Sequence, residues 1–205
     1  EKLVSSVKAE LSQLAMGRTK MEVSISQIAS DEGVPIEGQR YSFDYTGVDQ
    51  VEFLISPNPG EPLKPLATIA SGGESSRIML ALKVALSEID KVSTLIFDEI
   101  DSGIGGRIGN VVGEKLSNLS QGRQVLCVTH LPQIASFADH HIKVTKVIKS
   151  GRTITTAKVL STSDIIQEIT EMLGHVSEAS RQNAKDLLRL SSDYKKLNQF
   201  QFEKS

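Results

Sequence analysis

Two short apolar runs separated by a helical pattern constrain the fold of this 205-residue chain more than any other feature. Thr94 to Phe97 and Val125 to Val128 have the length and composition of central parallel strands, and the spacing between them predicts a helix from about Arg107 to Leu119. A crossover helix between two parallel strands makes a βαβ unit, and ligands bind at the carboxyl ends of its strands. The chain is therefore predicted to be an α/β protein with its site at that edge.

Two acids end the first of these strands. Asp98 and Glu99 directly follow Phe97, so their carboxylates are expected to project toward the ligand side of the sheet. The first acid suits Mg²⁺ ligation, and the second suits orienting or deprotonating a water molecule. A turn or helix-capping role would satisfy the same two residues, so this pattern alone leaves both interpretations open.

A glycine motif lies about 25 residues upstream. Ser71, Gly72, Gly73 and Glu74 stand at the start of a predicted helix that runs from about Glu74 to Ile89. Two glycines let the backbone approach an anion closely, and a helix N-terminus offers free N–H groups with a favourable dipole. By itself the motif could serve only as a helix cap. Followed by a strand that ends in Asp-Glu, it is typical of the signature loop and Walker B strand of an ATP-binding cassette, which predicts ATP and Mg²⁺ as ligands.

The phosphate loop of such a cassette is missing. The pattern G-x-x-x-x-G-K-[ST] occurs nowhere in the sequence. The chain is therefore predicted to be half of an ATPase head, one that binds ATP poorly and hydrolyses it negligibly when isolated.

Two further polar residues are placed where a nucleotide would bind. His130 follows the strand from Gln124 to Thr129, from where it can reach the γ-phosphate as a polar sensor. A lone histidine there is more often structural, but the acids on the neighbouring strand favour the sensor. Asp101 opens a glycine-rich loop, 101–106, which is either a flexible link or, in a dimeric cassette, a segment that crosses to the opposite active site.

The chain is predicted to have three parts. Residues 1–16 form a helix that is either core-facing or the end of a coiled coil entering from sequence that is not shown; its apolar stripe is Leu3, Val7, Leu11 and Leu14. Residues 17–193 form the main lobe, and residues 194–205 form a polar, frayed tail.

The main lobe begins with strands and ends with helices. Alternating patterns at 21–25, 41–45 and 51–55 predict an antiparallel β subdomain, with a loop at 31–38. Beyond His130 the pattern predicts a short helix at 132–137 and a hairpin at 142–160 that turns at Ser150-Gly151. Two more helices are predicted at 164–173 and 178–190.

Composition narrows the function classes. The net charge of −2 neither favours nor excludes nucleic acid as a partner. Cys127 is the only cysteine, so no intramolecular disulfide can form, which fits a reducing cytoplasm. No apolar run approaches the ~20 residues that cross a bilayer, so no membrane is expected as a partner. The predicted hairpin is basic, and its basic residues form either a solvated face or a weak DNA-binding patch. These residues are Lys143, Lys146, Lys149, Arg152 and Lys158.

The stretch from about Thr46 to His141 resembles the C-terminal lobe of the RecN family of bacterial DNA repair proteins, which are SMC-like ATP-binding cassette ATPases. The segments that carry the resemblance are 51–61 (VEFLISPNPGE), the signature, 97–106 (FDEIDSGIGG) and 128–135 (VTHLPQIA). Residues 171–174 and the helix after them also resemble the C-terminus of that family.

The resemblance implies the C-terminal half of a P-loop NTPase head of the ABC type, with an antiparallel β subdomain and flanking helices. In this family the phosphate loop (Walker A) lies in an N-terminal lobe, beyond a long antiparallel coiled coil. The roles that the resemblance implies are signature contacts to ATP in the opposing head for Ser71 and Gly73, Mg²⁺ binding for Asp98, general base for Glu99, the cross-dimer loop for Asp101 and the γ-phosphate switch for His130.

The implied function is Mg²⁺-dependent ATP hydrolysis in DNA double-strand break repair and recombination, in the cytoplasm at the nucleoid. Implied partners are the N-terminal Walker A lobe, a second identical head, DNA and recombination proteins. Two alternatives stay open: the head of a chromosome-organising or nuclease-associated SMC or Rad-type ATPase, and a nucleotide-gated DNA clamp with little hydrolysis.

Two positions depart from the expected patterns. Ala70 replaces the leucine that commonly precedes S-G-G in cassettes, although alanine there resembles the repair family. Ser75 stands where that family usually has a larger apolar residue, which is expected to weaken the packing of the signature helix.

Overall fold

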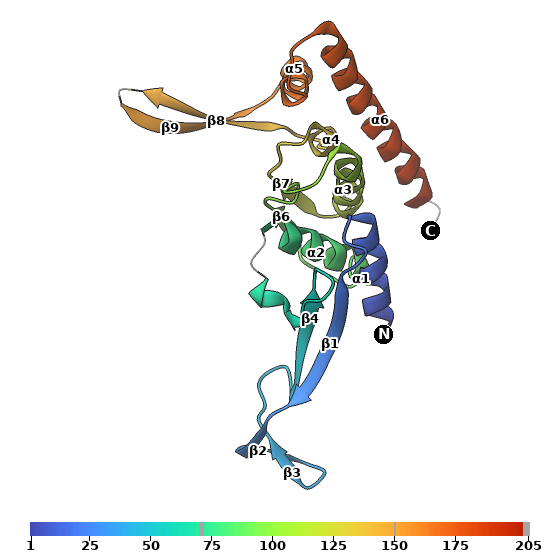
Figure 1. Cartoon of the computed structure of the whole chain (residues 1–205), viewed down its shortest axis with the longest axis vertical. Coiled ribbons are helices and arrows are strands. Elements are labelled where there is room, and N and C mark those ends of the chain that lie inside the picture. The colour runs from blue at the N-terminus through green and yellow to red at the C-terminus, as the bar shows by residue number, and fades with distance from the viewer. Residues whose placement is uncertain (70–71, 150, 203–205) are drawn as a thin grey trace. The chain divides into compact units, whose positions relative to one another are not determined.

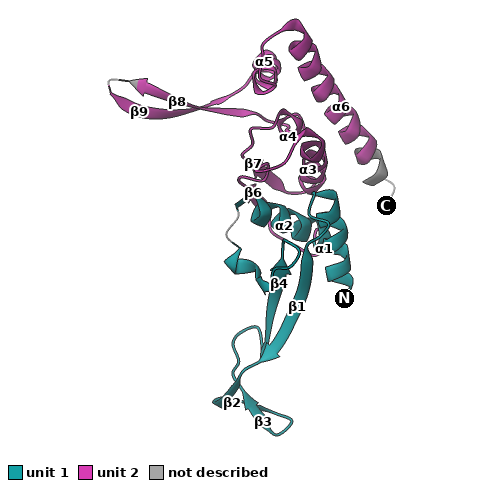
Figure 2. Ribbon diagram, viewed as in Figure 1, with its two compact units in different colours: residues 1–86 teal, residues 87–205 magenta. Residues whose placement is uncertain are grey.

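A computed structural model describes residues 1–69, 72–149 and 151–202 of the chain (Figure 1). The chain divides into two compact units, residues 1–86 and residues 87–205 (Figure 2). Among the described helices, none is long and apolar enough to cross a membrane.

The core of the first unit lies between two helices. Helix α1 (Lys2–Gln13) packs on α2 (Gly72–Ala85), and the apolar stripe of α1 faces this contact. Val7, Leu11 and Leu14 are fully or almost fully buried, as is Ile78 on α2. Within this unit the stripe therefore faces the core. That the helix is also the end of a coiled coil stays a prediction.

A long antiparallel ribbon leads away from this core (Figure 1). Strand β1 (Lys20–Gln27) pairs along its whole length with β4 (Asp49–Ser56), and the two-residue β5 (Lys64–Pro65) pairs with β4 before the 3-10 turn η1 (Leu66–Thr68). Met21 lies opposite Ile55 and both are buried, so one end of the ribbon belongs to the core. The predicted antiparallel subdomain is thus confirmed.

The far end of the ribbon differs from the prediction. Residues 31–38 were predicted to be a loop, but β2 (Ala29–Ile36) and β3 (Gln39–Tyr41) form a hairpin that turns at Glu37-Gly38 with positive φ at both residues. The pattern was misleading because β2 contains Gly33 and Pro35, which are depleted in strands. A side chain at Gly33 would place its Cβ only 1.9 Å from the Tyr41 carbonyl oxygen, so the close pairing requires glycine.

The predicted strand at 41–45 is wrong beyond its first residue. Of this stretch only Tyr41 belongs to β3, and Asp44 instead closes a tight loop by pairing with Gly47. The Asp44 carboxylate accepts hydrogen bonds from both the backbone N–H and the hydroxyl of Thr46, which favours a turn over an extended strand.

The second unit is built on the predicted βαβ element. Strands β6 (Thr94–Phe97) and β7 (Gln124–Cys127) are parallel, and α3 (Gly106–Leu119) connects them. Leu95 and Phe97 are buried on one face of this pair. The opposite face is apolar but open, with exposed fractions of 70% for Ile96, 43% for Leu126 and 62% for Val128.

Helices and one projecting hairpin complete the second unit. They are α4 (Pro132–Ala135), the antiparallel pair β8 (Ile142–Lys149) and β9 (Arg152–Val159), α5 (Thr162–Met172) and α6 (Glu178–Phe202). The predicted hairpin is confirmed; of its predicted turn residues, Ser150 lies outside the described part and Gly151 has a positive φ.

Helix α6 corrects the prediction of a frayed tail at 194–205. It continues past Leu190 to Phe202, and residues in this part pack on the rest of the unit. Tyr194 meets the ring of Phe137 edge to face, with centroids 5.7 Å apart, and Lys195 pairs with Asp139 at 2.7 Å. These contacts lie far apart in the sequence, so the apolar spacing along the helix alone did not reveal them.

We expect Leu11→Ala to lower the free energy of unfolding by about 2–5 kcal/mol, because it leaves a cavity in the core between α1 and α2. Leu197→Ala is the control, since this leucine is 68% exposed on α6 and its truncation should cost less than about 0.5 kcal/mol. Urea denaturation measures both. Equal effects would show that the α1 stripe does not face a core.

Candidate functional site

The acidic pair lies in a strained turn at the carboxyl end of β6. The carboxylate of Asp98 accepts a hydrogen bond from the backbone N–H of Glu99 at 2.9 Å. Glu99 itself has a φ of +55°, in the left-handed backbone region that residues other than glycine rarely adopt. Both side chains are exposed. Strain of this kind persists where the surrounding structure imposes it and is frequent at functional sites.

The carboxylate of Asp101 accepts two hydrogen bonds from the loop after β7 and lies beside the His130 ring. Its Oδ2 accepts the hydroxyl of Thr129 at 2.5 Å and the backbone N–H of His130 at 2.7 Å, and it lies 3.0 Å from Nδ1 of the His130 ring. Asp101 is 3% exposed. One oxygen of Asp101 thus binds Thr129 and His130, which lie 28 and 29 positions further along the chain.

The sequence-predicted residues of the second unit therefore gather at one end of the β6–β7 pair. The N–H of Val128 donates to the Phe97 carbonyl at 2.9 Å, which extends the ladder to the last residues before the two loops. Asp101 and His130 are in direct contact. The printed partners of the Asp101 side chain, all on Oδ2, lie within its own chain.

Thr129 was not predicted as a site residue. Besides donating to Asp101, its Oγ1 accepts the N–H of Leu131 at 3.0 Å, so it holds both the acid and the loop that carries the histidine. The only available sequence signal was a hydroxyl residue next to the predicted sensor histidine, a pattern too common to single it out.

Close packing holds the two loops together. A Cβ added to Gly106 would lie 2.9 Å from Nε2 of Gln133, and one added to Gly109 would lie 3.2 Å from the Leu131 side chain. The loop after β7 thus sits directly on the first turns of α3, and glycine at Gly106 permits this approach.

The predicted signature residues belong to the first unit. Ser71, together with Ala70, lies outside the described residues. Helix α2 begins at Gly72, Gly73 is buried, and Glu74 lies in the first turn, where its charge is favourable to the helix dipole.

The departure at Ser75 has a structural role. Its hydroxyl donates to the Ile69 carbonyl at 3.3 Å and so ties the helix to the segment before the signature. Arg77, which the sequence did not single out, is only 8% exposed on the same helix. Burial lowers the pKa of its guanidinium, while the charge of Glu74 raises it.

Cys127 is shielded from reaction. Burial raises the pKa of its thiol to about 12, and the negative charges of Asp101 and Asp98 add to the effect. Since the thiolate is the nucleophile, the raised pKa disfavours reaction at this half-buried cysteine at neutral pH. The prediction that it is a packing residue is consistent with this environment.

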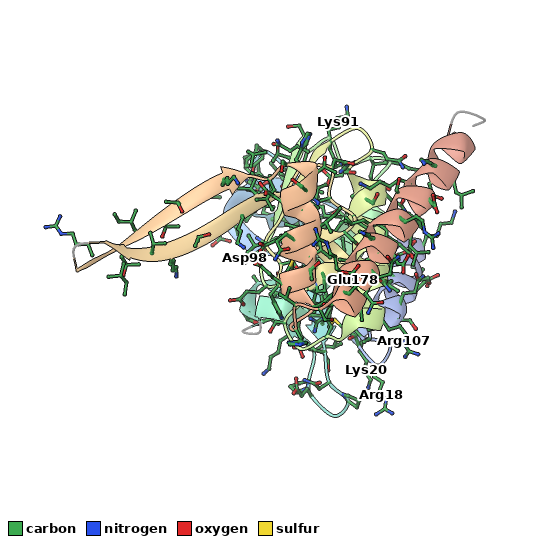
Figure 3. The ribbon with its side chains drawn as sticks, turned by 90° about the horizontal axis from the view of Figure 1, so that it is seen from above. Arg18, Lys20, Lys91, Asp98, Arg107 and Glu178 are labelled. Atoms are coloured by element: carbon green, nitrogen blue, oxygen red, sulfur yellow. The ribbon has the colours of Figure 1, made fainter. Side chains whose placement is uncertain are left out.

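The basic face of the hairpin is partly neutralised. Lys143 pairs with Glu168 and Glu171, and Lys158 pairs with Asp164, so acids of α5 hold the base of the hairpin. The hydrogen bonds to these carboxylates raise the pKa of Lys143. Figure 3 shows the rest of the hairpin projecting with side chains on both faces. The ion pairs favour a structural role for these two lysines over DNA contact.

The donor set suits Mg²⁺ bound mainly by a nucleotide. Among the described residues, no group of three or more His, Cys, Asp or Glu side chains could hold a metal ion. Mg²⁺ is usually bound by one or two carboxylates together with substrate phosphates and water. The exposed carboxylate of Asp98, oriented by the N–H of Glu99, fits that role.

Comparison with known proteins finds relatives among DNA repair proteins named RecN. The DNA repair protein RecN of Halalkalibacterium halodurans is 43% identical over 195 residues, which cover 94% of this chain and 33% of that protein. RecN of Bacillus subtilis is 40% identical over 95% of this chain and 35% of its own length, and RecN of Treponema pallidum is 45% identical over 89% and 31%. The chain thus spans about one third of the length of these relatives.

Similar solved structures are SMC heads. An SMC ATPase chain, described for ATP-driven dimerization and DNA-stimulated activation, is 19% identical with a TM-score of 0.46 over 86% of this chain and 94% of that one. The Smc head domain with an extended coiled coil from Pyrococcus furiosus, bound to the C-terminal domain of ScpA, is 20% identical with a TM-score of 0.47 over 84% and 38%. TM-scores below 0.5 do not by themselves establish a shared fold. No family model matches the chain.

We expect Glu99→Gly to be more stable than Glu99→Ala by about 1 kcal/mol, because glycine adopts the left-handed conformation without strain. Chemical denaturation of the two variants gives the difference. The control is the same pair of substitutions at Lys185, an exposed position inside α6, where glycine should instead be about 1 kcal/mol less stable than alanine. A Glu99→Ala variant at least as stable as Glu99→Gly would contradict the strained turn.

Proposed function

We propose that this chain, which matches RecN proteins along nearly all of its own length, is one lobe of an ATP-hydrolysing head that acts in bacterial DNA double-strand break repair and recombination. The observation that carries the proposal is the pairing of two loops at one end of the β6–β7 sheet. One loop presents Asp98 and Glu99, and the other presents His130 against Asp101. Their side chains supply the acid, base and sensor groups that nucleotide hydrolysis needs.

We infer a role for each group. Asp98 would hold Mg²⁺, which neutralises phosphate charge. Glu99, whose side chain is exposed beyond the strained turn, would orient or deprotonate the attacking water. The ring of His130 is 75% exposed and would meet the γ-phosphate. Gly72, Gly73 and Glu74 at the start of α2, with Ser71 before them, would contact the ATP of an opposing head, as the resemblance implies.

The phosphate loop would come from a further lobe of the same protein. The chain contains no Walker A pattern and spans about one third of its relatives. Parallel sheets are normally covered on both faces. The exposed side chains of Ile96, Leu126 and Val128 leave an apolar face on the β6–β7 pair that such a lobe would cover.

The remaining parts of the proposal follow from the same family relation. ATP would lie between two heads, and the second head would come from another copy of the protein. DNA and recombination proteins would be further partners. We expect the protein in the bacterial cytoplasm at the nucleoid. The isolated chain should bind ATP poorly and turn it over negligibly.

Steady-state ATP turnover of the protein that joins this lobe to its Walker A lobe tests the proposal, with ATP binding assayed separately. Glu99→Gln should keep ATP binding and lower turnover about a hundredfold or more, because it removes the base and keeps the shape. Glu88→Gln, an equal charge change at an exposed residue of the same unit, should leave turnover unchanged.

Each other outcome has a distinct meaning. Unchanged turnover in Glu99→Gln would refute the role of Glu99. A parent protein that binds ATP without hydrolysing it would favour a nucleotide-gated clamp. Efficient turnover by residues 1–205 alone would refute the half-head itself.

A further inference from the structure

The small net charge of the chain, −2, conceals two segments of opposite charge. Residues 20–63, which include strands β1 to β4, carry eight acidic and two basic residues, a net charge of −6. Residues 142–163, which include the β8–β9 hairpin, carry five basic residues and no acidic residue. A polyanion is therefore expected to avoid the first segment and to be attracted to the second.

Ion pairs divide this hairpin into a neutralised base and a charged tip, residues 146–152. At the base, Lys143 and Lys158 pair with acids of α5. Among the described residues, no ion pair involves Lys146 or Arg152. Every residue with a described side chain from 144 to 159 is exposed. The excess positive charge of the hairpin therefore belongs to its tip.

The strand register places the two cations of the tip on opposite faces. Successive residues of a strand point to opposite faces, and residues directly opposite each other share a face. Arg152 lies opposite position 149, three residues beyond Lys146 on β8, so Lys146 and Arg152 belong to different faces. Figure 3 shows side chains on both faces of the hairpin. Hydroxyl groups accompany the cations on both faces, from Thr145, Thr153, Thr155 and Thr156.

A narrow ribbon with cations on both faces fits a groove that has phosphates along both walls. The major groove of B-form DNA is about 12 Å wide and admits a two-stranded β-ribbon. Lysine, arginine and threonine side chains commonly bind the phosphate oxygens of DNA. A flat anionic surface would meet only one face of the ribbon and leave the cation on the other face without a partner.

We propose that the hairpin tip inserts into the major groove of duplex DNA and binds phosphates on both walls through Lys146 and Arg152. Phosphate contacts carry no sequence information, so this binding is independent of base sequence. The inference deepens the part of the proposed function that names DNA as a partner. It requires no nucleotide, so it can be tested apart from ATP hydrolysis.

Fluorescence anisotropy of a labelled DNA duplex, titrated with the 205-residue chain at several low salt concentrations, tests the inference. The double substitution Lys146→Gln with Arg152→Gln should weaken binding about tenfold or more. It should also make the slope of log K against log salt shallower by about two, because each lost phosphate contact changes this slope by about one. The control is Lys91→Gln with Lys185→Gln, which removes the same charge from exposed lysines outside the hairpin and should leave affinity and slope unchanged.

An RNA duplex of the same sequence separates groove insertion from general attraction between charges. The major groove of A-form RNA is deep and narrow, so the ribbon should not enter it. We expect the wild-type chain to bind the RNA duplex about tenfold more weakly than the DNA duplex, and the double variant to lose this difference. Equal binding of both duplexes by the wild type would overturn groove insertion.

Two other outcomes would contradict the role of the tip. One is a wild-type chain that does not bind the DNA duplex at low salt. The other is a folded double variant that binds DNA as the wild type does, or no more weakly than the control variant. In the protein with both lobes, ATP turnover without DNA should be unchanged by the double substitution. If that protein hydrolyses no ATP, the proposed hydrolysis fails, and the DNA titration still decides the role of the tip.

Discussion

The parallel pairing of β6 with β7 is the constraint on which the candidate site depends. Their register, with Phe97 beside Cys127 and the Val128 N–H on the Phe97 carbonyl, brings two loops to the same end of the sheet. One loop carries the acids and the other carries the histidine. The water-activating and phosphate-sensing roles that we propose for these groups require this pairing, because it brings both loops to one ligand.

The same pair of strands has one apolar face that is exposed. One face of the pair carries the buried Leu95 and Phe97, whereas Ile96, Leu126 and Val128 are exposed on the other. A parallel sheet with one apolar face in water is not a stable end point, since such sheets normally have both faces covered. Together with the missing Walker A pattern, this face suggests that the sheet and the active site are completed by the same additional lobe.

Local patterns in the sequence were sufficient for the βαβ unit and the β8–β9 hairpin, because their strands are short, apolar or alternating, and bounded by turn residues. They failed where tertiary contacts decide the structure. Strand β2 exists despite Gly33 and Pro35, and the last turns of α6 are held by Tyr194 and Lys195 against residues more than 50 positions away.

In the candidate site too, local sequence patterns predicted some features, and tertiary contacts determined the others. The location of Asp98, Glu99 and His130 could be predicted, because all three lie within three residues of the end of a short apolar strand; their chemical roles stay predictions. The strain at Glu99 and the buried contact of Asp101 with Thr129 could not be predicted, since they depend on how two distant loops meet. As a result Asp101, predicted to act across a dimer, has its carboxylate bonded within its own chain.

The central claim is that this chain is half of a nucleotide site. Calorimetric titration of Mg-ATP, into the chain alone and into the protein that joins it to its Walker A lobe, tests it most directly. The account predicts saturable binding to the joined protein and no measurable binding to the chain alone under the same conditions. Equally tight binding to both would contradict it, because the phosphate-binding groups would then lie within these 205 residues.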